Sequence, residues 1–381
     1  MLAGFAAAAQ GQAPRKETSV SPEGLTAAID KLGALDYSER AAASRSVRRA
    51  PAAPAVAALL HAATGHIDGF VRFRAAVLLT GFPDPRVKDL MQEFLADPND
   101  RLRQVAYRYF EHHPDPALAD ALLGALEREQ AEFVRPALVR ALAALGADRR
   151  AQQALLTEMT SASTVFRSAA IEALGDYRAR YAAGALVAAT RVEGPSREPA
   201  ALALGKLGDR SQLPVLAGLQ KSAPQEAQPS VAAAICLLGV NCSSHLGYLE
   251  RVLRFAEKTP GFQPLVRGAA GGLGALAGQG NDEALALLID TGQASRDPLR
   301  APIALALGAA ALRNPTFVLG ALEQRANRGP ALALLAEAFE MLEEDFEKER
   351  FFVTARRAYW QAAEGSATRR LVQELFDQLE F

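Results

Sequence analysis

The residue types best suited to binding a metal are concentrated between Leu102 and Asp115. Glu111, His112, His113 and Asp115 carry carboxylate or imidazole groups within five positions of the chain. Such groups bind divalent metals, but adjacent residues at the end of a helix point in different directions. We therefore predict no metal site and no cofactor from this stretch.

The same stretch is unusually aromatic. Tyr107, Tyr109 and Phe110 stand where related stretches of the chain have Ala or Gly. These side chains either pack differently in the core or form a surface for another protein. Because aromatic and arginine side chains often anchor interfaces, we predict partner contacts at Tyr107, Arg108, Tyr109 and His112.

The chain lacks the motifs of common enzyme classes. It contains no G-x-S-x-G, S-x-x-K, P-loop or H-E-x-x-H pattern, and neither Cys has an evident His partner. We therefore predict no catalytic residues and a protein that is not an enzyme. The 42 Lys and Arg residues nearly balance the 43 Asp and Glu residues, so charge does not indicate a nucleic-acid partner.

The two cysteines lie on either side of a predicted turn, Gly239-Val240-Asn241. The turn folds the chain back, so Cys236 and Cys242 would form a disulfide in an oxidising compartment. The alternative is a buried, apolar Cys236 and an unpaired Cys242. Two cysteines are too few for a structural zinc site.

An arginine recurs about every thirty residues and marks a structural repeat. The first five are separated by steps of 31, 32, 32 and 30, a period typical of solenoids. Each lies in the first turn of a predicted helix, where the helix macrodipole opposes a positive charge. We expect acids three or four residues earlier to offset that charge, and a neighbouring repeat to do so for Arg167 and Arg267. The arginines of this ladder are Arg72, Arg103, Arg135, Arg167, Arg197, Arg267 and Arg300, and the expected acids are Asp68, Asp100, Glu132, Glu193 and Asp297.

Two kinds of helix alternate around this ladder. First helices, predicted at 86–96, 116–127, 150–160, 179–191 and 213–222, follow turns with Pro or Asp and carry Leu at helical spacing. Second helices begin with the ladder arginine and are rich in Ala, which lets neighbouring repeats approach closely. The pattern predicts an all-α fold, an α-solenoid built as a superhelix of antiparallel helix pairs.

The second helices resemble the HEAT-like repeats of the phycobilisome-lyase type, whose pattern is V-R-x-x-A-A-x-A-L-G-x-L-G-D. The resemblance is closest at 166–176 and 197–209 and covers about residues 55–340. It implies the solenoid fold but no single function. The sequence lacks the functional features of two other families with a similar repeat fold. Deoxyhypusine hydroxylases hold iron with His-Glu dipeptides, and DNA-alkylation-repeat glycosylases would show a basic groove. None of this chain's histidines is followed by Glu; they are His61, His66, His112, His113 and His245.

The sequence divides into four segments. Residues 1–17 are similar to the end of a secretory signal peptide, with Ala7-Ala8-Ala9 as a cleavage site, or else form a disordered Ala-rich tail. Residues 18–54 are predicted to be a degenerate N-terminal capping repeat, residues 55–328 the repeat array, and residues 329–381 a C-terminal helical cap.

Two segments depart from the repeat. The C-terminal cap carries seven acids between Glu337 and Glu349, which we expect to face solvent or to bind a basic partner. The glycine-rich segment 268–280 requires either very close packing or a point of bending, because interior glycines weaken a helix.

These observations predict a non-catalytic scaffold that binds another protein or protein complex. We expect an exported, periplasmic protein of bacterial origin, with a cytoplasmic one as the alternative. It could serve as an accessory subunit of a larger envelope or membrane complex, although no segment of its own is apolar enough to span a bilayer. The alternative function is a lyase or chaperone-lyase acting on a tetrapyrrole or another prosthetic group.

Overall fold

The computed structural model describes residues 21–259, 261–342 and 344–379. Within these residues it contains 22 α-helices, five short 3-10 helices and no strand. The first helices of the pairs are α1 (Pro22–Asp30), α3 (Ala52–Gly65), α5 (Arg86–Phe94), α7 (Ala119–Arg128), α9 (Arg149–Glu158), α11 (Ala183–Arg191), α13 (Leu213–Ser222), α15 (Cys242–Lys258), α17 (Asp282–Ala294), α19 (Pro315–Glu323) and α21 (Asp345–Gln361). The second helices are α2 (Tyr37–Arg49), α4 (Gly69–Leu79), α6 (Asp100–His112), α8 (Arg135–Ala144), α10 (Thr164–Asp176), α12 (Arg197–Lys206), α14 (Gln228–Leu237), α16 (Gln263–Gly278), α18 (Arg300–Arg313), α20 (Gly329–Met341) and α22 (Ala367–Leu379).

Local sequence explains where the helices begin and which side they bury. Some second helices begin after short polar residues whose side chains accept hydrogen bonds from free backbone N–H groups, such as Asp68 before α4 and Asn99 before α6. A first helix such as α5 buries four apolar residues at helical spacing, namely Val87, Leu90, Met91 and Phe94. The polar side of each first helix is therefore left to face outward.

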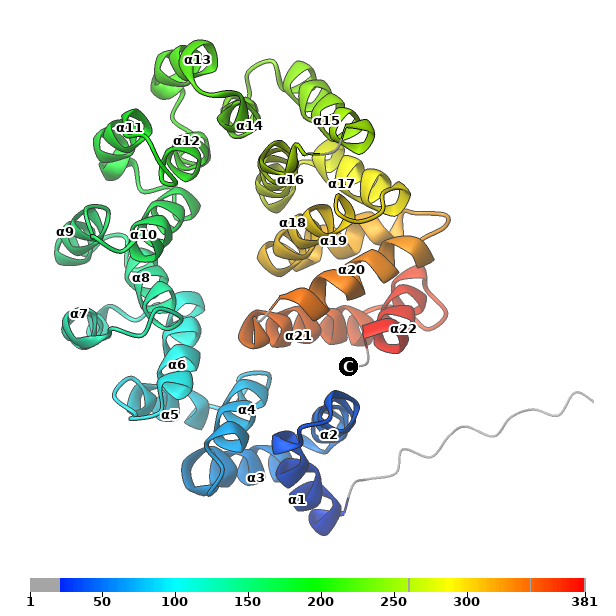
Figure 1. The fold of residues 1–381 in the computed structure, drawn as a ribbon. Coiled ribbons are helices and arrows are strands. Elements are labelled where there is room, and N and C mark those ends of the chain that lie inside the picture. Colours follow the sequence, from blue (N-terminus) through cyan, green and yellow to red (C-terminus); the bar gives the residue numbers. More distant parts are fainter. Residues whose placement is uncertain (1–20, 260, 343, 380–381) are drawn as a thin grey trace, which may run out of the picture.

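The helix pairs stack into a curved array with an inner and an outer layer (Figure 1). From α6 to α20 each second helix contacts the next, and these helices form the inner wall. The first helices lie outside them. The predicted all-α solenoid is confirmed.

Close approach between the inner helices depends on small residues. Gly205 in α12 lies so near α14 that an added Cβ would come within 2.6 Å of the Ala234 Cα and carbonyl oxygen. The glycine-rich α16 is likewise one continuous helix packed closely at Gly272 and Gly274, against Ala233 and Ala306 respectively. Of the two alternatives for this segment, close packing is the one the structure shows.

Substitution of Gly205 tests this packing. We expect Gly205→Ala to lower the free energy of unfolding by about 1–3 kcal/mol, because the backbone of α14 cannot yield as a side chain would. Gly218 is the matched control, since it is exposed within α13 and nothing lies within 4 Å of its added Cβ. Gly218→Ala should raise stability by about 0.5–1 kcal/mol. Urea denaturation measures both, and equal stability of the two variants would contradict the packing account.

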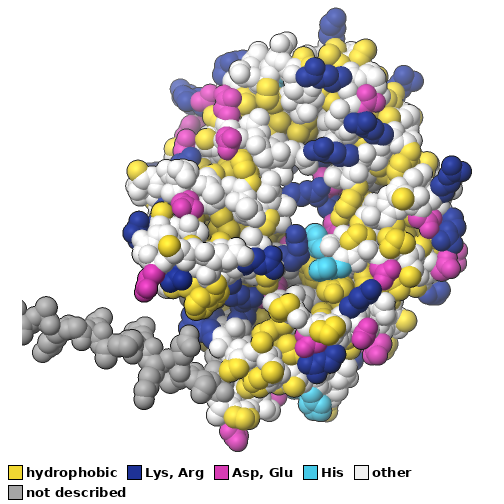
Figure 2. Space-filling model, turned by 180° about the vertical axis from the view of Figure 1, so that it is seen from behind, with side chains coloured by type: hydrophobic (Ala, Val, Ile, Leu, Met, Phe, Trp, Pro, Cys, Tyr) yellow, Lys and Arg dark blue, Asp and Glu magenta, His cyan; other side chains and the backbone are white. Residues whose placement is uncertain are grey.

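The array curves until its two ends meet. The C-terminal α21 packs on α4, and in Figure 1 the last helices lie beside the first ones. The space-filling view shows an opening through the middle of the molecule (Figure 2). The chain is therefore a ring, a feature that the repeat pattern alone does not predict.

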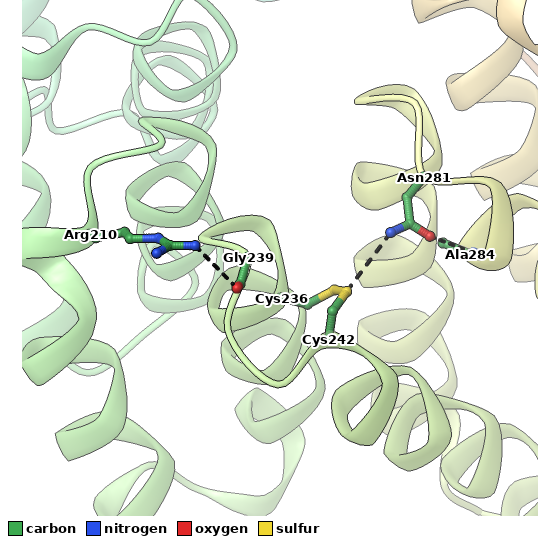
Figure 3. Close-up of a disulfide and its surroundings, with 6 residues drawn as sticks. All are labelled: Arg210, Cys236, Gly239, Cys242, Asn281 and Ala284. Atoms are coloured by element: carbon green, nitrogen blue, oxygen red, sulfur yellow. Dashed lines mark hydrogen bonds between the residues drawn. A yellow bond between two sulfur atoms is a disulfide. The ribbon is translucent and has the colours of Figure 1, made fainter.

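A disulfide joins Cys236, near the end of α14, to Cys242 at the start of α15, with Cα atoms 4.3 Å apart (Figure 3). The tight turn between them uses left-handed backbone at Gly239 and Asn241. Arg210 from the preceding repeat donates to the Gly239 carbonyl, and Asn281 from the following one lies 3.8 Å from the Cys242 Sγ. The bridge thus lies where three repeats meet.

Two sequence expectations concern membranes or export. The proposed signal remnant at 1–17 lies outside the described residues. Among the described residues, no single helix is long and apolar enough to cross a membrane; α18 and α19 together have the length and composition, but they are bent by 113° where they meet.

Candidate functional site

The inner wall of the ring encloses a cavity of about 900 Å³. It is lined by the second helices from α6 to α18 and by the start of α21. Ala and Gly residues form its smooth parts, and Lys and Arg side chains are visible around the opening in Figure 2. Sequence analysis did not predict this cavity, because it exists only once the ring is closed.

Asp176, at the end of α10, is the centre of an ion-pair network on the cavity wall. Its carboxylate accepts hydrogen bonds from Lys206 Nζ at 2.8 Å, Arg140 Nη1 at 2.9 Å and Arg313 Nη1 at 2.6 Å. Burial alone would raise the pKa of Asp176, but these three cations outweigh burial and lower it to about 2. Because Arg313 comes from α18, this carboxylate connects helices on opposite sides of the ring.

Glu111, near the end of α6, is the second centre of the network. Its buried carboxylate accepts hydrogen bonds from Arg140 Nε at 2.7 Å, from Tyr177 Oη at 2.9 Å and from Arg108 Nη1 at 3.1 Å. Burial opposes its ionisation, yet Arg140 and Arg108 lower its pKa. Burial and the adjacent Glu111 charge raise the pKa of Tyr177, which keeps its hydroxyl protonated as a donor.

Three possible metal ligands meet in this network. Ligand atoms of Glu111, His112 and Glu347 all lie within 4.8 Å of one another. Sequence analysis considered His113 and Asp115 instead, because Glu347 is remote in the chain. Each carboxylate already accepts hydrogen bonds from arginine, Glu111 from two and Glu347 from Arg350. A further cation there would be repelled by these arginines, so the geometry fits an ion-pair network better than a metal site.

Other cavity groups show how unusual this environment is. Glu172 faces the cavity, and burial raises its pKa. Burial also raises the pKa of Glu198, which accepts a hydrogen bond from Ser230. Arg267, one of the ladder arginines, is exposed to the cavity. No local sequence signal separates these residues from ordinary surface charges.

The residues predicted to contact a partner are engaged within the chain itself. Tyr107 is 1% exposed, and its hydroxyl lies 3.4 Å from the Leu95 carbonyl. The prediction that it faces a partner is therefore wrong, and it belongs to the alternative of altered core packing. Tyr109 is half-buried and stacks on His113 with ring centres 4.3 Å apart.

Arg108 and His112 contact the C-terminal cap instead of solvent. Arg108 Nη2 lies 3.1 Å from a Glu344 carboxylate oxygen, and His112 Nε2 lies 2.8 Å from Glu347 Oε1. The expectation of a solvated acidic face on the cap fails in the same region, since Glu347 and Glu349 are buried. Acids of the C-terminal cap therefore pair with basic residues of the first repeats.

The ladder arginines join repeats, but not through the acids that sequence analysis named. Arg72 pairs with Asp97 at 2.9 Å, whereas Asp68 caps the helix. The same inter-repeat arrangement is seen for Arg103 with Glu129, Arg135 with Glu158 and Arg300 with Glu337. Only Arg197 lies near its expected acid, Glu193, at 3.9 Å.

A second function of the ladder explains its place in the first turn. Arg135 Nη1 donates to the Leu126 and Glu129 carbonyls at the end of the preceding first helix, and Arg167 Nη1 donates to the Ser161 and Ala162 carbonyls. Cations are favourable at helix C-termini, where carbonyl groups lack partners. Arg135 therefore stabilises the end of a neighbouring helix, and Arg167 the turn that follows one, which offsets their unfavourable place in their own helices.

Comparisons with known proteins agree with this architecture. A family model of HEAT repeats matches residues 87–175, which span α5 to α10. No curated protein matches the chain.

Several solved structures are similar in fold. The complex of CpcE and CpcF of phycocyanin lyase from Nostoc sp. PCC7120 matches with a TM-score of 0.41 and 22% identity, over 67% of this chain and 94% of that chain. Importin beta matches with a TM-score of 0.40 and 16% identity, over 94% of this chain and 52% of its own. A mutant of Kap121p matches with a TM-score of 0.40 and 13% identity, over 93% and 45%. The chain spans about half the length of the last two. The repeated helix pairs show that this chain is an α-solenoid, and its residues 87–175 match HEAT repeats.

Proposed function

We propose that this protein is a non-catalytic scaffold that binds another protein along one edge of the ring. The observation that carries the proposal is a row of exposed aliphatic and aromatic side chains at one set of turns. These residues, which we call the apolar rim, are Leu35, Ile67, Phe133, Val165 and Val192.

The solenoid places the apolar rim on a single edge. Each rim residue lies at or next to a turn that joins a first helix to its second helix, and in antiparallel pairs all such turns share one edge. Leu35 is 100% exposed and Ile67 is 99% exposed. Burying large apolar side chains on a partner is favourable by roughly 1.5–3 kcal/mol each, so a short row suffices for specific binding.

The α5–α6 repeat lies between those of Ile67 and Phe133 and contributes no residue to the apolar rim. Arg101 occupies the corresponding position there. The Arg101 guanidinium lies 5.7 Å from the centre of the Phe70 ring and 5.9 Å from that of Phe133. Arginine held on aromatic rings is a common anchor at protein interfaces. The rim thus combines apolar area with a positioned cation, and these residues replace Tyr107, Arg108, Tyr109 and His112 as the proposed partner contacts.

The proposal extends to the setting of the protein. As a rigid ring with an exposed edge, the protein would be suited to bind a partner protein or complex and to serve as an accessory subunit of a larger bacterial envelope or membrane assembly. The Cys236–Cys242 disulfide supports export to an oxidising compartment. Intact mass spectrometry of the protein from its native source tests export directly, through its N-terminus and the mass change on reduction.

Co-purification from the native source tests the rim. We expect the double variant Ile67→Ser and Phe133→Ser to lose a stoichiometric partner, with at least a tenfold drop in recovery, and to unfold at the same urea concentration as the wild type. Tyr181→Ser is the matched control, because Tyr181 is exposed at the start of the α11 region, on the opposite edge. Retention of the partner by the double variant, or its equal loss from the control, would contradict the proposal.

The cavity gives one reason to keep the second candidate, a lyase or chaperone-lyase for a tetrapyrrole or other prosthetic group. Its volume of about 900 Å³ is of the size that encloses small ligands. An absorption spectrum of the purified protein separates the two: a bound pigment would favour the lyase, and a colourless protein unaffected by added pigment would favour the scaffold.

A further inference from the structure

We infer that α21 is a releasable internal ligand, and that the inner face of the first three repeats is a second binding surface for an acidic helix with aromatic residues. This inference goes beyond the scaffold function proposed for the rim, and its test uses no rim partner. The binding surface consists of Arg48, Arg74, Arg108 and His112, from α2, α4 and α6. We call its contact with α21 the seam.

Charge complementarity at the seam is complete. Arg48 Nη2 lies 2.6 Å from Glu349, and Arg74 Nη2 lies 3.6 Å from Asp345. Arg108 and His112 pair with Glu344 and Glu347 as described above. All four basic side chains belong to the first repeats, and all four acids belong to one short segment, 344–349.

Two aromatic side chains add to this recognition. Among the described residues of the C-terminal cap, Phe346 alone joins the first hydrophobic core, which otherwise runs from Leu25 to Leu238. Its ring stacks on His112, with ring centres 5.9 Å apart. Arg48 lies over the Phe352 ring, 5.0 Å from its centre. The surface therefore recognises a helix whose first two turns carry acids and phenylalanines.

The hydrophobic cores show that the seam joins two separate bodies. The second core runs from Ala232 to Leu375 and meets the first one within α14. Within each core the repeats share buried apolar residues with their neighbours, which is the usual contact between repeats, and α14 contributes residues to both cores. At the seam this shared apolar contact is reduced to Phe346.

Packing at the seam is incomplete. A cavity of about 380 Å³ lies between α2, α4 and the C-terminal cap. Six buried side-chain polar atoms lack a hydrogen-bond partner among the described residues. Two belong to the seam arginines, Arg74 Nε and Arg108 Nε; a third is Arg356 Nη1 of α21, and a fourth is Nε of Arg40, which lines this cavity. Burial also lowers the pKa of Arg74 and of Arg356. Unsatisfied buried donors are costly, and this cost weakens the seam.

Opening at the seam would also strain two polar contacts across the ring. These are the Arg313–Asp176 pair and the hydrogen bond from Arg178 to Gln279 Oε1. Both are polar and partly open to solvent at Arg313 and Arg178. A competing acidic helix therefore needs to displace polar contacts and one phenylalanine, but no continuous core.

The test combines small-angle X-ray scattering with binding of a labelled synthetic peptide of residues 344–361. The charge reversal Glu344→Lys with Asp345→Lys should open the ring and so raise the radius of gyration. It should also raise the affinity for the peptide about tenfold, because α21 no longer occupies the binding surface. Gly81→Leu is a second opener that changes no charge, since an added Cβ at Gly81 would lie 2.7 Å from Glu349 Oε1.

Matched controls make the outcomes decisive. Asp282→Lys with Glu283→Lys makes the same charge change on exposed residues of α17 and should alter neither readout. Adding Arg74→Glu and Arg108→Glu to the first variant reverses both pairs and should close the ring again. Unchanged scattering in both opened variants would overturn the release of α21. Open scattering without tighter peptide binding would overturn the binding surface.

Discussion

Asp176→Asn is expected to lower the free energy of unfolding by about 3–5 kcal/mol, the typical cost of breaking a buried ion pair by removing one partner. The substitution leaves Lys206, Arg140 and Arg313 converging on a neutral amide that accepts far less from them. The Asp176 side chain is 10% exposed, so water cannot replace the lost charge. Chemical denaturation of the two proteins at neutral pH measures the difference.

The pH dependence of the same pair of proteins identifies the cause. The pKa of Asp176 is lowered from 3.8 to about 2 on folding, so its contribution to stability is complete above pH 4 and is lost as the pH falls through 2. By linkage this contribution is about 2 kcal/mol. The wild type should therefore lose more stability than Asp176→Asn between pH 5 and pH 2. Parallel curves would show that the ion pairs do not cause the effect.

Local sequence was sufficient to predict the helix pairs and their stacking into a solenoid. The Leu spacing of the first helices, the Ala-rich second helices and the ladder arginines all report contacts between adjacent repeats, which are close in the chain. Asp68 shows the limit even there. It lies four residues before Arg72, as a pairing acid would, but its carboxylate caps the helix and Arg72 reaches Asp97 in the next first helix.

Ring closure could not be predicted, because curvature accumulates from small rotations between repeats that no single motif encodes. Its consequences decide the environment of the residues that looked functional. Arg108 and His112 resemble free surface groups in the sequence, yet each pairs with an acid of the C-terminal cap. The cap's acids resemble a solvated face for the same reason. The basic residues of α6 and the acids of the C-terminal cap are partners of each other, and this pairing cannot be recognised when each stretch of sequence is considered alone.

Arg135→Ala is expected to be the most destabilising change on the arginine ladder, by about 3–5 kcal/mol. Arg135 is buried, and its guanidinium donates to both carboxylate oxygens of Glu158, at 3.1 and 2.6 Å. Glu158 is itself buried, so removal of the arginine leaves an uncompensated charge as well as two helix-end carbonyls without their donor.

Arg167→Ala is the matched comparison, because Arg167 donates to the Ser161 and Ala162 carbonyls and to Thr164 but pairs with no acid in the part of the chain that the structure describes. It should cost only about 1–2 kcal/mol, the scale of ordinary hydrogen bonds. Replacing both members of the buried pair, as Arg135→Met with Glu158→Leu, should recover most of the stability lost in Arg135→Ala, because no buried charge then remains. If the double variant is as unstable as Arg135→Ala, the helix-end carbonyls rather than Glu158 carry the effect, and the ladder acts by capping helices more than by joining repeats.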